Sequence, residues 1–230
     1  MKRFLYENSL GLVFGLLFLT ALVGQAFAGH ADFNQQQLSK GLQLISLGRC
    51  LASASFAVDV TENWQSEYLQ FFLYILLTVW LLQKGSPESE ELDKAGRESD
   101  EEQMVGAHAP APAPMWARVG GLRRALFSRS LGLVLGAIFM LSWLAQSITG
   151  VAAYNEHRLG NLQDPVSWGR YLLQPDFWNR PLENWQSELL AVSSMVVLSI
   201  YLRHGGSSQS KPVDAAHTSN GVDRRAPQPS

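Results

Sequence analysis

Four stretches without a charged residue limit how this chain can fold. Residues 9–29 and 130–150 are about 21 residues long, and residues 68–82 and 189–202 are about 15 residues long. Because an α-helix rises about 1.5 Å per residue, about 20 apolar residues cross a hydrocarbon layer about 30 Å thick. The two longer stretches therefore predict transmembrane helices by themselves.

The two shorter stretches reach this length if the tryptophan-led segment before each of them forms the first helical turn. Trp64 begins one such segment and Trp185 begins the other. Tryptophan prefers the membrane interface, where its ring is half-buried and its N–H is hydrated. The sequence thus predicts an all-α integral membrane protein. Its four transmembrane helices are expected at residues 9–29, 64–83, 130–150 and 185–203.

An internal repeat relates the two halves of the chain. A shift of 121 residues places Ser9–Val13 on Ser130–Val134, and Glu62–Glu67 on Glu183–Glu188, without a gap. About 26 of the 73 positions from 9 to 81 are identical under this shift, which indicates duplication of one unit. We therefore expect two tandem helix-loop-helix repeats, residues 1–84 and 116–204. Each repeat crosses the membrane twice, so both should have the same orientation.

The distribution of lysine and arginine predicts the orientation in the membrane. These residues concentrate at the N-terminus, in the central segment and near the C-terminus. The positive-inside rule then places both termini in the cytoplasm and the loops 30–63 and 151–184 outside. The basic start and Ala26–Gly29 also fit a cleaved signal peptide. The corresponding third span cannot be a signal, so we expect the first span to be retained.

Two segments have the composition of disordered chain. Residues 85–115 are first acidic and then rich in Ala and Pro, and residues 205–230 are rich in small and polar residues. Such segments cannot bury enough apolar surface to offset the loss of chain entropy. The first is expected to be a solvated tether between the repeats, although a phosphorylated or partner-binding linker is an alternative.

The first and third spans share residues that trace one helix face. Small residues in Gly-x-x-x-Gly spacing let another helix approach closely within lipid. A glutamine near the outer end of each seam predicts an interhelical hydrogen bond or, alternatively, part of a polar path. The matched residues are Gly11, Gly15, Phe18, Gln25 and Gly29 in the first span and Gly132, Gly136, Phe139, Gln146 and Gly150 in the third.

The strongest candidate site is the repeated sequence Glu-Asn-Trp-Gln-Ser-Glu, called the six-residue motif below. Its asparagines are expected to cap helices, and its final glutamates to lie in the first turn, where they need partners. We expect Arg49 to pair with Glu67 and Arg170 with Glu188, and a binding or proton-handling role of the glutamates is an alternative. The motif residues are Glu62, Asn63, Trp64, Gln65, Ser66 and Glu67, and Glu183, Asn184, Trp185, Gln186, Ser187 and Glu188.

Several function classes are not expected. Cys50 is the single cysteine, which excludes an intramolecular disulfide, and the formal charge of −2 gives no signal for nucleic acid. The five histidines have no ligand spacing, and no catalytic motif occurs, so we expect no metal, no cofactor and no enzyme activity. The leading hypothesis is a non-enzymatic protein of the lipid bilayer that acts by assembly, as a homo-oligomer or with unidentified protein partners. A solute channel or transporter between the repeats is the alternative, and a membrane enzyme comes third.

The chain resembles a family of bacterial multi-pass membrane proteins that is catalogued as a domain of unknown function. The resemblance is carried by the basic start, the span from Ser9 to Gln25, the motif Glu62–Glu67 and the segment Lys84–Ser89. The second copy departs at Gly205–Ser208, where the Lys-Gly-Ser-Pro form is replaced. The resemblance implies four spans in the bacterial inner membrane, and it implies no activity, cofactor or catalytic residue.

Overall fold

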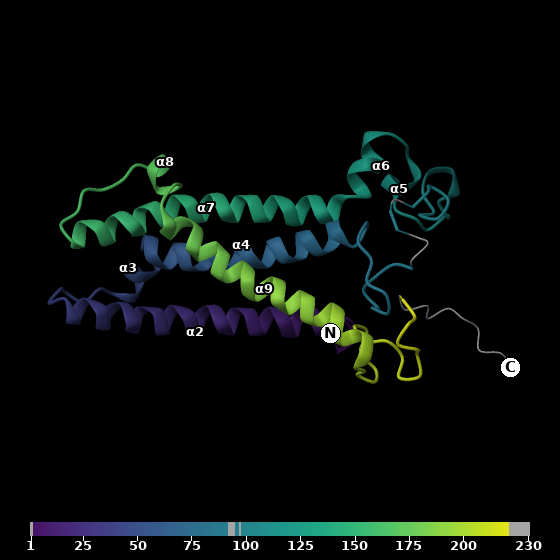
Figure 1. Ribbon diagram of the computed structural model, residues 1–230, viewed down its shortest axis with the longest axis horizontal. Helices are drawn as coiled ribbons and strands as arrows, with labels where there is room; N and C mark the ends of the chain where they lie inside the picture. The colour runs from purple at the N-terminus through teal and green to yellow at the C-terminus, as the bar shows by residue number, and fades with distance from the viewer. Residues whose placement is uncertain (1, 92–94, 97, 221–230) are drawn as a thin grey trace. The chain divides into compact units, whose positions relative to one another are not determined.

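The described part of the protein is helical. The structure is a computed structural model that describes residues 2–91, 95–96 and 98–220 (Figure 1), and within these ranges it contains helices and no strand. The predicted all-α class is therefore confirmed for these residues. The chain divides into two units, Met1–Thr61 with Ala145–Gln174, and Glu62–Leu144 with Pro175–Ser230.

Each unit contains complete helices and parts of two helices, α4 and α7, that run through both. The first unit contains α1 (Lys2–Glu7), α2 (Ser9–Ser39), α3 (Leu47–Leu51), the start of α4 (Ala54–Leu77), the end of α7 (Ser130–Gly160) and α8 (Trp168–Tyr171). The second unit contains the rest of α4 and α7, the 3₁₀ turn η1 (Gly106–His108), α5 (Met115–Arg118), α6 (Leu122–Phe127) and α9 (Pro175–Tyr201).

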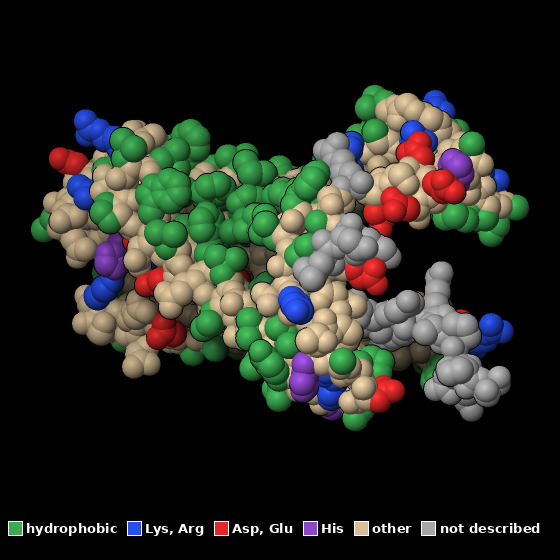
Figure 2. All heavy atoms as spheres, turned by 45° about the vertical axis from the view of Figure 1, so that its right-hand side comes forward, with side chains coloured by type: hydrophobic (Ala, Val, Ile, Leu, Met, Phe, Trp, Pro, Cys, Tyr) green, Lys and Arg blue, Asp and Glu red, His purple; other side chains and the backbone are tan. Residues whose placement is uncertain are grey.

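Helices α2 and α7 are the two described helices that are long and apolar enough to cross a membrane. Each has 31 residues, and each exposes large apolar side chains along its length, such as Leu10, Phe14 and Leu141. Figure 2 shows apolar side chains gathered over the helices. The length and apolar surface of these two helices suit a membrane protein.

The helices extend beyond the predicted spans at their outer ends. Helix α2 continues to Ser39 and α7 to Gly160, about ten residues past the last predicted span residues, while α4 and α9 begin at Ala54 and Pro175. Hydropathy marks the part of a helix that suits lipid, whereas backbone hydrogen bonds can continue through polar residues outside it. The irregular part of each outer loop is therefore shorter than expected.

The predicted helix caps at Asn63 and Asn184 are wrong, because both residues lie inside helices. Helix α4 begins nine residues before Asn63, after Ser53, whose hydroxyl accepts the N–H of Phe56 at 3.2 Å. Helix α9 begins at Pro175, where the missing N–H of proline costs no helical hydrogen bond. The polar motif was mistaken for a helix start because it precedes the apolar stretch.

The observed helices recur at the spacing of the sequence repeat. Helices α2 and α7 begin at Ser9 and Ser130, and α4 and α9 begin at Ala54 and Pro175, each pair 121 residues apart. Both long helices are followed by a left-handed residue, Gly41 with φ 69° and Leu162 with φ 58°. Corresponding segments of the chain thus form corresponding helices.

Candidate functional site

The six-residue motif lies within α4 in its first copy and within α9 in its second. Gln65 is 0% exposed and Ser66 is 2% exposed, whereas Glu67 is exposed. The Ser66 hydroxyl donates to the backbone oxygen of Asn63 at 2.9 Å, and the Ser187 hydroxyl donates to that of Asn184 at 2.8 Å. The serines are therefore satisfied by their own helices in both copies.

An ion pair joins the first copy of the motif to helix α9. Arg180 Nη1 lies 3.1 Å from Glu62 Oε2, and Arg180 Nε lies 3.6 Å from Asp176 Oδ2. The Glu62 side chain is 17% exposed and that of Arg180 is 35% exposed, so solvent screens the pair only in part. Glu183, in the second copy, instead accepts from Asn179 Nδ2 at 2.9 Å.

The arginines that were predicted to pair with Glu67 and Glu188 lie in short loop helices. Arg49 belongs to α3 and Arg170 to α8, and both side chains are exposed. Their backbone N–H groups donate to Ser46 and Ser167, each at 3.4 Å, which caps the two short helices. Both arginines belong to the first unit and both glutamates to the second, so the two pairs stay predictions.

Aromatic side chains surround the second copy of the motif. The Trp143 ring stacks on Phe139 and Phe177, with centroids 5.5 Å and 6.5 Å apart, and meets Trp178 and Trp185 edge-on at 6.0 Å and 5.8 Å. Such edge-on and offset arrangements are favoured by the ring quadrupoles. Trp185 thus belongs to a packed aromatic cluster of the second unit. Trp64, its counterpart in the first copy, is 42% exposed.

Two glutamines have buried amide atoms without a hydrogen-bond partner among the described residues. They are both side-chain polar atoms of Gln65 and the oxygen Oε1 of Gln146, whereas Gln25 is half-buried. A buried polar group without a partner costs about 1–3 kcal/mol. A water molecule or a small solute that reached these amides would satisfy them.

The predicted glycine seam is close-packed at one of its two Gly-x-x-x-Gly motifs. A Cβ atom at Gly136 would lie 3.0 Å from the Phe72 ring, so α7 and α4 approach closely there. At Gly11, Gly15 and Gly132, no described atom beyond the local helix backbone lies within 4 Å of such a Cβ. The seam of α2 is therefore open where that of α7 is filled.

Asn34, near the end of α2, and Asn155, near the end of α7, bind the backbone of the loop that follows each helix, and neither was singled out from the sequence. Asn34 accepts the N–H of Ile45 at 2.9 Å and donates to its carbonyl at 3.1 Å. Asn155 makes the same two bonds to Val166, at 2.8 Å and 2.9 Å. We call these pairs the asparagine clasps. Their signal in the sequence was identity at positions 34 and 155 within otherwise divergent loops.

The turns after α4 and α9 match in geometry, although the sequence departs from the Lys-Gly-Ser-Pro form at Gly205–Ser208. Both have the form Gly-Ser-x-x-Ser, and Gly85 and Gly206 have φ of 85° and 83°. The Ser89 hydroxyl accepts the N–H of Gln83 at 2.9 Å, and Ser210 accepts that of His204 at 2.9 Å. The turn is kept because Gly85, Ser86 and Ser89 correspond to Gly206, Ser207 and Ser210, although Lys84 and Pro87 are replaced by Gly205 and Ser208.

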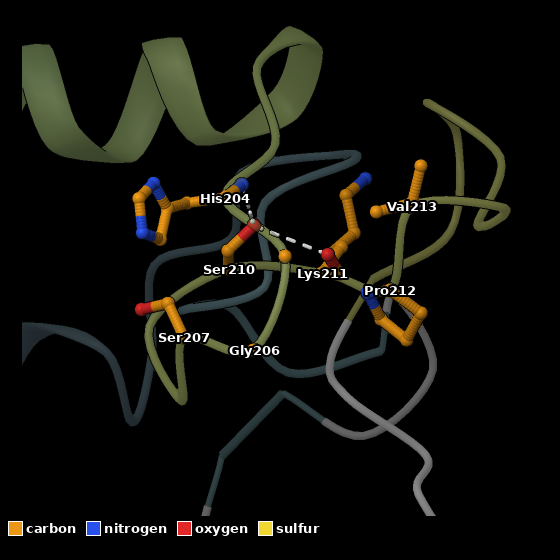
Figure 3. Close-up of a pocket in the computed structure, with 8 residues that line it drawn as sticks. His204, Gly206, Ser207, Ser210, Lys211, Pro212 and Val213 are labelled. Atoms are coloured by element: carbon orange, nitrogen blue, oxygen red, sulfur yellow. Dashed lines mark hydrogen bonds between the residues drawn. The ribbon is translucent and has the colours of Figure 1, made fainter.

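A small pocket lies over the second of these turns. Its volume is about 250 Å³, and Figure 3 shows residues from His204 to Val213 around it. Lys211 is 2% exposed, and its Nζ donates to the carbonyls of Gly85, Ala216, His217 and Ser219 at 2.5–3.3 Å. Burial, assisted by the nearby charge of Arg203, lowers the pKa of Lys211. The hydrogen-bond donors of the Lys211 ammonium group are therefore satisfied by backbone carbonyls of the protein.

Buried Cys50 occupies the position that corresponds to Tyr171 in the second copy. Burial, with the negative charge of Asp59, raises the pKa of the Cys50 thiol. A raised pKa keeps the thiol protonated and unreactive at neutral pH. Tyr171 is 1% exposed, and its hydroxyl lies 2.6 Å from where a Cβ of Gly150 would be. Both residues are packing residues of the first unit.

Comparison with known protein families identifies one match. The model of the family described as Domain of unknown function (DUF6766) matches residues 1–222. The chain belongs to this family. No curated protein and no solved structure matches the chain. The expected membership in a family of unknown function is confirmed, and its description names no activity that could be assigned to the residues above.

Proposed function

We propose that this member of the family is a multi-pass protein of the bacterial inner membrane that acts by assembling with further copies of itself, without catalysis. Its four transmembrane helices would belong to α2, α4, α7 and α9, in two tandem parallel repeats with both termini in the cytoplasm. The apolar helices α2 and α7 support the membrane location. The recurrence of helix bounds, asparagine clasps and serine turns at 121 residues supports the duplication.

The charges near the starts of the second and fourth proposed spans are compatible with this arrangement. Helix α4 covers residues 64–77 of the second proposed span, and α9 covers residues 185–201 of the fourth; both helices begin about ten residues before these spans. Charged residues at membrane depth are costly unless they are paired. The pair of Glu62 with Arg180 offsets this cost at the outer end of both helices.

The open glycine seam of α2 is the observation that supports assembly. Phe72 fills the seam of α7 at Gly136. Under the 121-residue shift Phe72 corresponds to Ser193, so the second copy has a small side chain where the first has a phenylalanine. Close helix packing supplies much of the stability of helix association in lipid, so an open seam favours a partner helix. A second copy of α2 offers the same small residues and fits this seam.

Single-molecule photobleaching of the labelled protein in liposomes tests this proposal. Gly15→Leu should abolish closely packed dimers and shift the population to single copies, because the leucine prevents backbone approach. Gly24→Leu is the matched control, since Gly24 lies on the opposite face of the same helix and its Cβ would also meet nothing within 4 Å. Single copies of the wild type, or equal loss in both variants, would refute assembly through this seam.

A solute channel or transporter is the second candidate, and the unpartnered buried amide of Gln65 favours it. Such an amide can replace part of the hydration shell of a polar solute. Flux into liposomes should then occur for the wild type and fall at least tenfold in Gln65→Leu. The Glu67→Gln, Glu188→Gln double variant tests the motif carboxylates in the same assay. Absence of flux for water, ions and small polar solutes would exclude this candidate.

A further inference from the structure

The segment before α7 is strongly basic. Residues 115–129 contain four arginines, Arg118, Arg123, Arg124 and Arg129, and no acidic residue. The segment includes α5 and α6, which pack against each other, and it ends directly before Ser130, the first residue of α7. We call residues 115–129 the arginine-rich segment.

Large apolar side chains are exposed on the same segment. Met115 is 68% exposed, Trp116 44%, Leu122 74% and Phe127 39%, while Ala117 is buried. Figure 2 shows apolar, basic and acidic side chains together on the part of the molecule that contains α5 and α6 in Figure 1. Basic residues that alternate with exposed Trp, Phe and Leu are typical of segments that bind at a membrane surface.

An acidic residue of the preceding segment forms an ion pair with one of these arginines. Asp100 Oδ2 lies 2.9 Å from Arg124 Nη1, and the two side chains are 59% and 28% exposed. Arg118, Arg123 and Arg129 are exposed, and none of them pairs with a carboxylate among the described residues. Three guanidinium groups therefore face solvent, and the fourth is held by a carboxylate that a competing anion can replace.

We propose that the arginine-rich segment binds anionic phospholipid headgroups at the cytoplasmic leaflet, and that Asp100 competes with these headgroups for Arg124. The planar guanidinium group binds phosphate through two parallel hydrogen bonds. Trp116, Leu122 and Phe127 would insert at the level of the headgroups, and continuity with α7 holds the segment there. This inference rests on the proposed membrane location.

The full-length chain in nanodiscs provides the test. A spin label at Gly120→Cys, in a Cys50→Ser background, reports contact with lipid-soluble oxygen and with a water-soluble nickel complex. Gly120 is exposed between α5 and α6, with nothing within 4 Å of its Cβ position. Adding phosphatidylglycerol to phosphatidylcholine should raise the ratio of oxygen to nickel contact several-fold. High salt should reduce this change because it screens exposed charges.

Two variants and a matched control separate the effects of the arginines and of Asp100 on the response to phosphatidylglycerol. Arg118→Gln with Arg123→Gln should remove the response to phosphatidylglycerol, whereas Asp100→Asn should produce it at a lower phosphatidylglycerol content. Arg158→Gln with Arg170→Gln removes the same amount of charge from the other predicted side of the membrane and should leave the response intact.

The possible failures are distinguishable. If the chain does not enter nanodiscs, the proposed membrane location is wrong, and this inference is wrong with it. If the chain enters but the label responds equally to both lipid compositions, the membrane location stands and headgroup binding is overturned. A response that persists unchanged in the double arginine variant would also overturn it.

Discussion

Residues 9–89 and 130–210 share several side chains that bind backbone and differ in several side chains that fill space. The shared polar residues bind main-chain groups at the same positions, and they include Asn34 and Asn155, Ser46 and Ser167, and Ser89 and Ser210. The divergent residues fill space, and they include Leu22 and Trp143, Cys50 and Tyr171, Ala57 and Trp178, and Phe72 and Ser193. Backbone groups that leave water need partners in either copy.

The divergence decides where each segment is closely packed. In the second segment, Trp143 and Trp178 enlarge an aromatic cluster, and Tyr171 closes on Gly150. In the first, Leu22, Ala57 and Cys50 are smaller, and no described atom beyond the local helix backbone approaches within 4 Å of a Cβ at Gly29. The two segments thus share these backbone bonds and differ in their packing, with Gly150 closely packed and Gly29 open.

The largest effect is expected at the shared asparagine clasps. Asn34→Ala and Asn155→Ala should each destabilise the protein by about 2 kcal/mol, since each removes two bonds to backbone of about 1 kcal/mol. Asn34→Ala also removes the bond of Asn34 to His30 Nε2 at 2.9 Å and should cost more. Denaturant unfolding in detergent micelles, followed by tryptophan fluorescence, measures this loss. Asn155→Asp keeps the oxygen that accepts the N–H of Val166, so it should lose about half as much free energy of unfolding as Asn155→Ala. A smaller loss of stability for Asn34→Ala than for Asn155→Ala would break the equivalence of the copies.

Alanine at the two corresponding glycines should have opposite effects. Gly150→Ala should destabilise by about 1–2 kcal/mol because its Cβ overlaps the Tyr171 hydroxyl. Gly29→Ala should stabilise by about 0.5–1 kcal/mol, because alanine is the better helix former and the site is open. The same unfolding measurement applies, and Tyr171→Phe should relieve much of the Gly150→Ala loss. A change in unfolding free energy of the same sign for both variants would contradict the difference in packing between Gly150 and Gly29.

The pair of Arg180 with Glu62 is the third test, since the position of Arg180 holds Asp59 in the first copy. A double-mutant cycle with Arg180→Gln and Glu62→Gln should give a coupling of about 1 kcal/mol or less, because the pair is partly exposed. Exchange of the two charges, Arg180→Glu with Glu62→Arg, should recover part of the coupling. Additive single-variant effects would show that the contact does not stabilise the fold.

The smallest effect is expected for Arg49 with Glu67. Arg49→Ala should speed proteolysis of the first outer loop, and a double-mutant cycle with Glu67→Gln should give about 0.5 kcal/mol or less for an exposed pair. The parallel cycle with Arg170 and Glu188 should give a similar value if the copies share this contact. Unchanged folding and unchanged protection of the loop would exclude the pairing.

The sequence predicted the regular features of the fold, because they follow from local pattern. Long apolar stretches and the 121-residue shift anticipated α2 and α7 and their common length. The small size of glycine anticipated close approach at Gly136. The starts of α4 and α9 were missed, since no change in hydropathy marks the boundary at Ser53 or Pro175.

The contacts of the candidate site could not be predicted in the same way. Glu62 and Arg180 are 118 residues apart and do not correspond under the repeat, so the shift provided no reason to pair them. The two bonds of each asparagine clasp depend on a loop returning to its own helix, which hydropathy does not describe. The sequence shows that positions 34 and 155 are both asparagine, but only the backbone geometry shows which groups these side chains bind.

The continuation of α2 to Ser39 determines how far the outer end of the protein would reach from the bilayer. Ten residues past the apolar stretch correspond to about 15 Å of helix. The headgroup layer on each side of a bilayer is about 5–8 Å thick. In the proposed arrangement, Gly41 would therefore stand in open water above the lipid, and the chain after it returns to Asn34 through the backbone of Ile45. An epitope inserted there should be accessible to an antibody on intact spheroplasts.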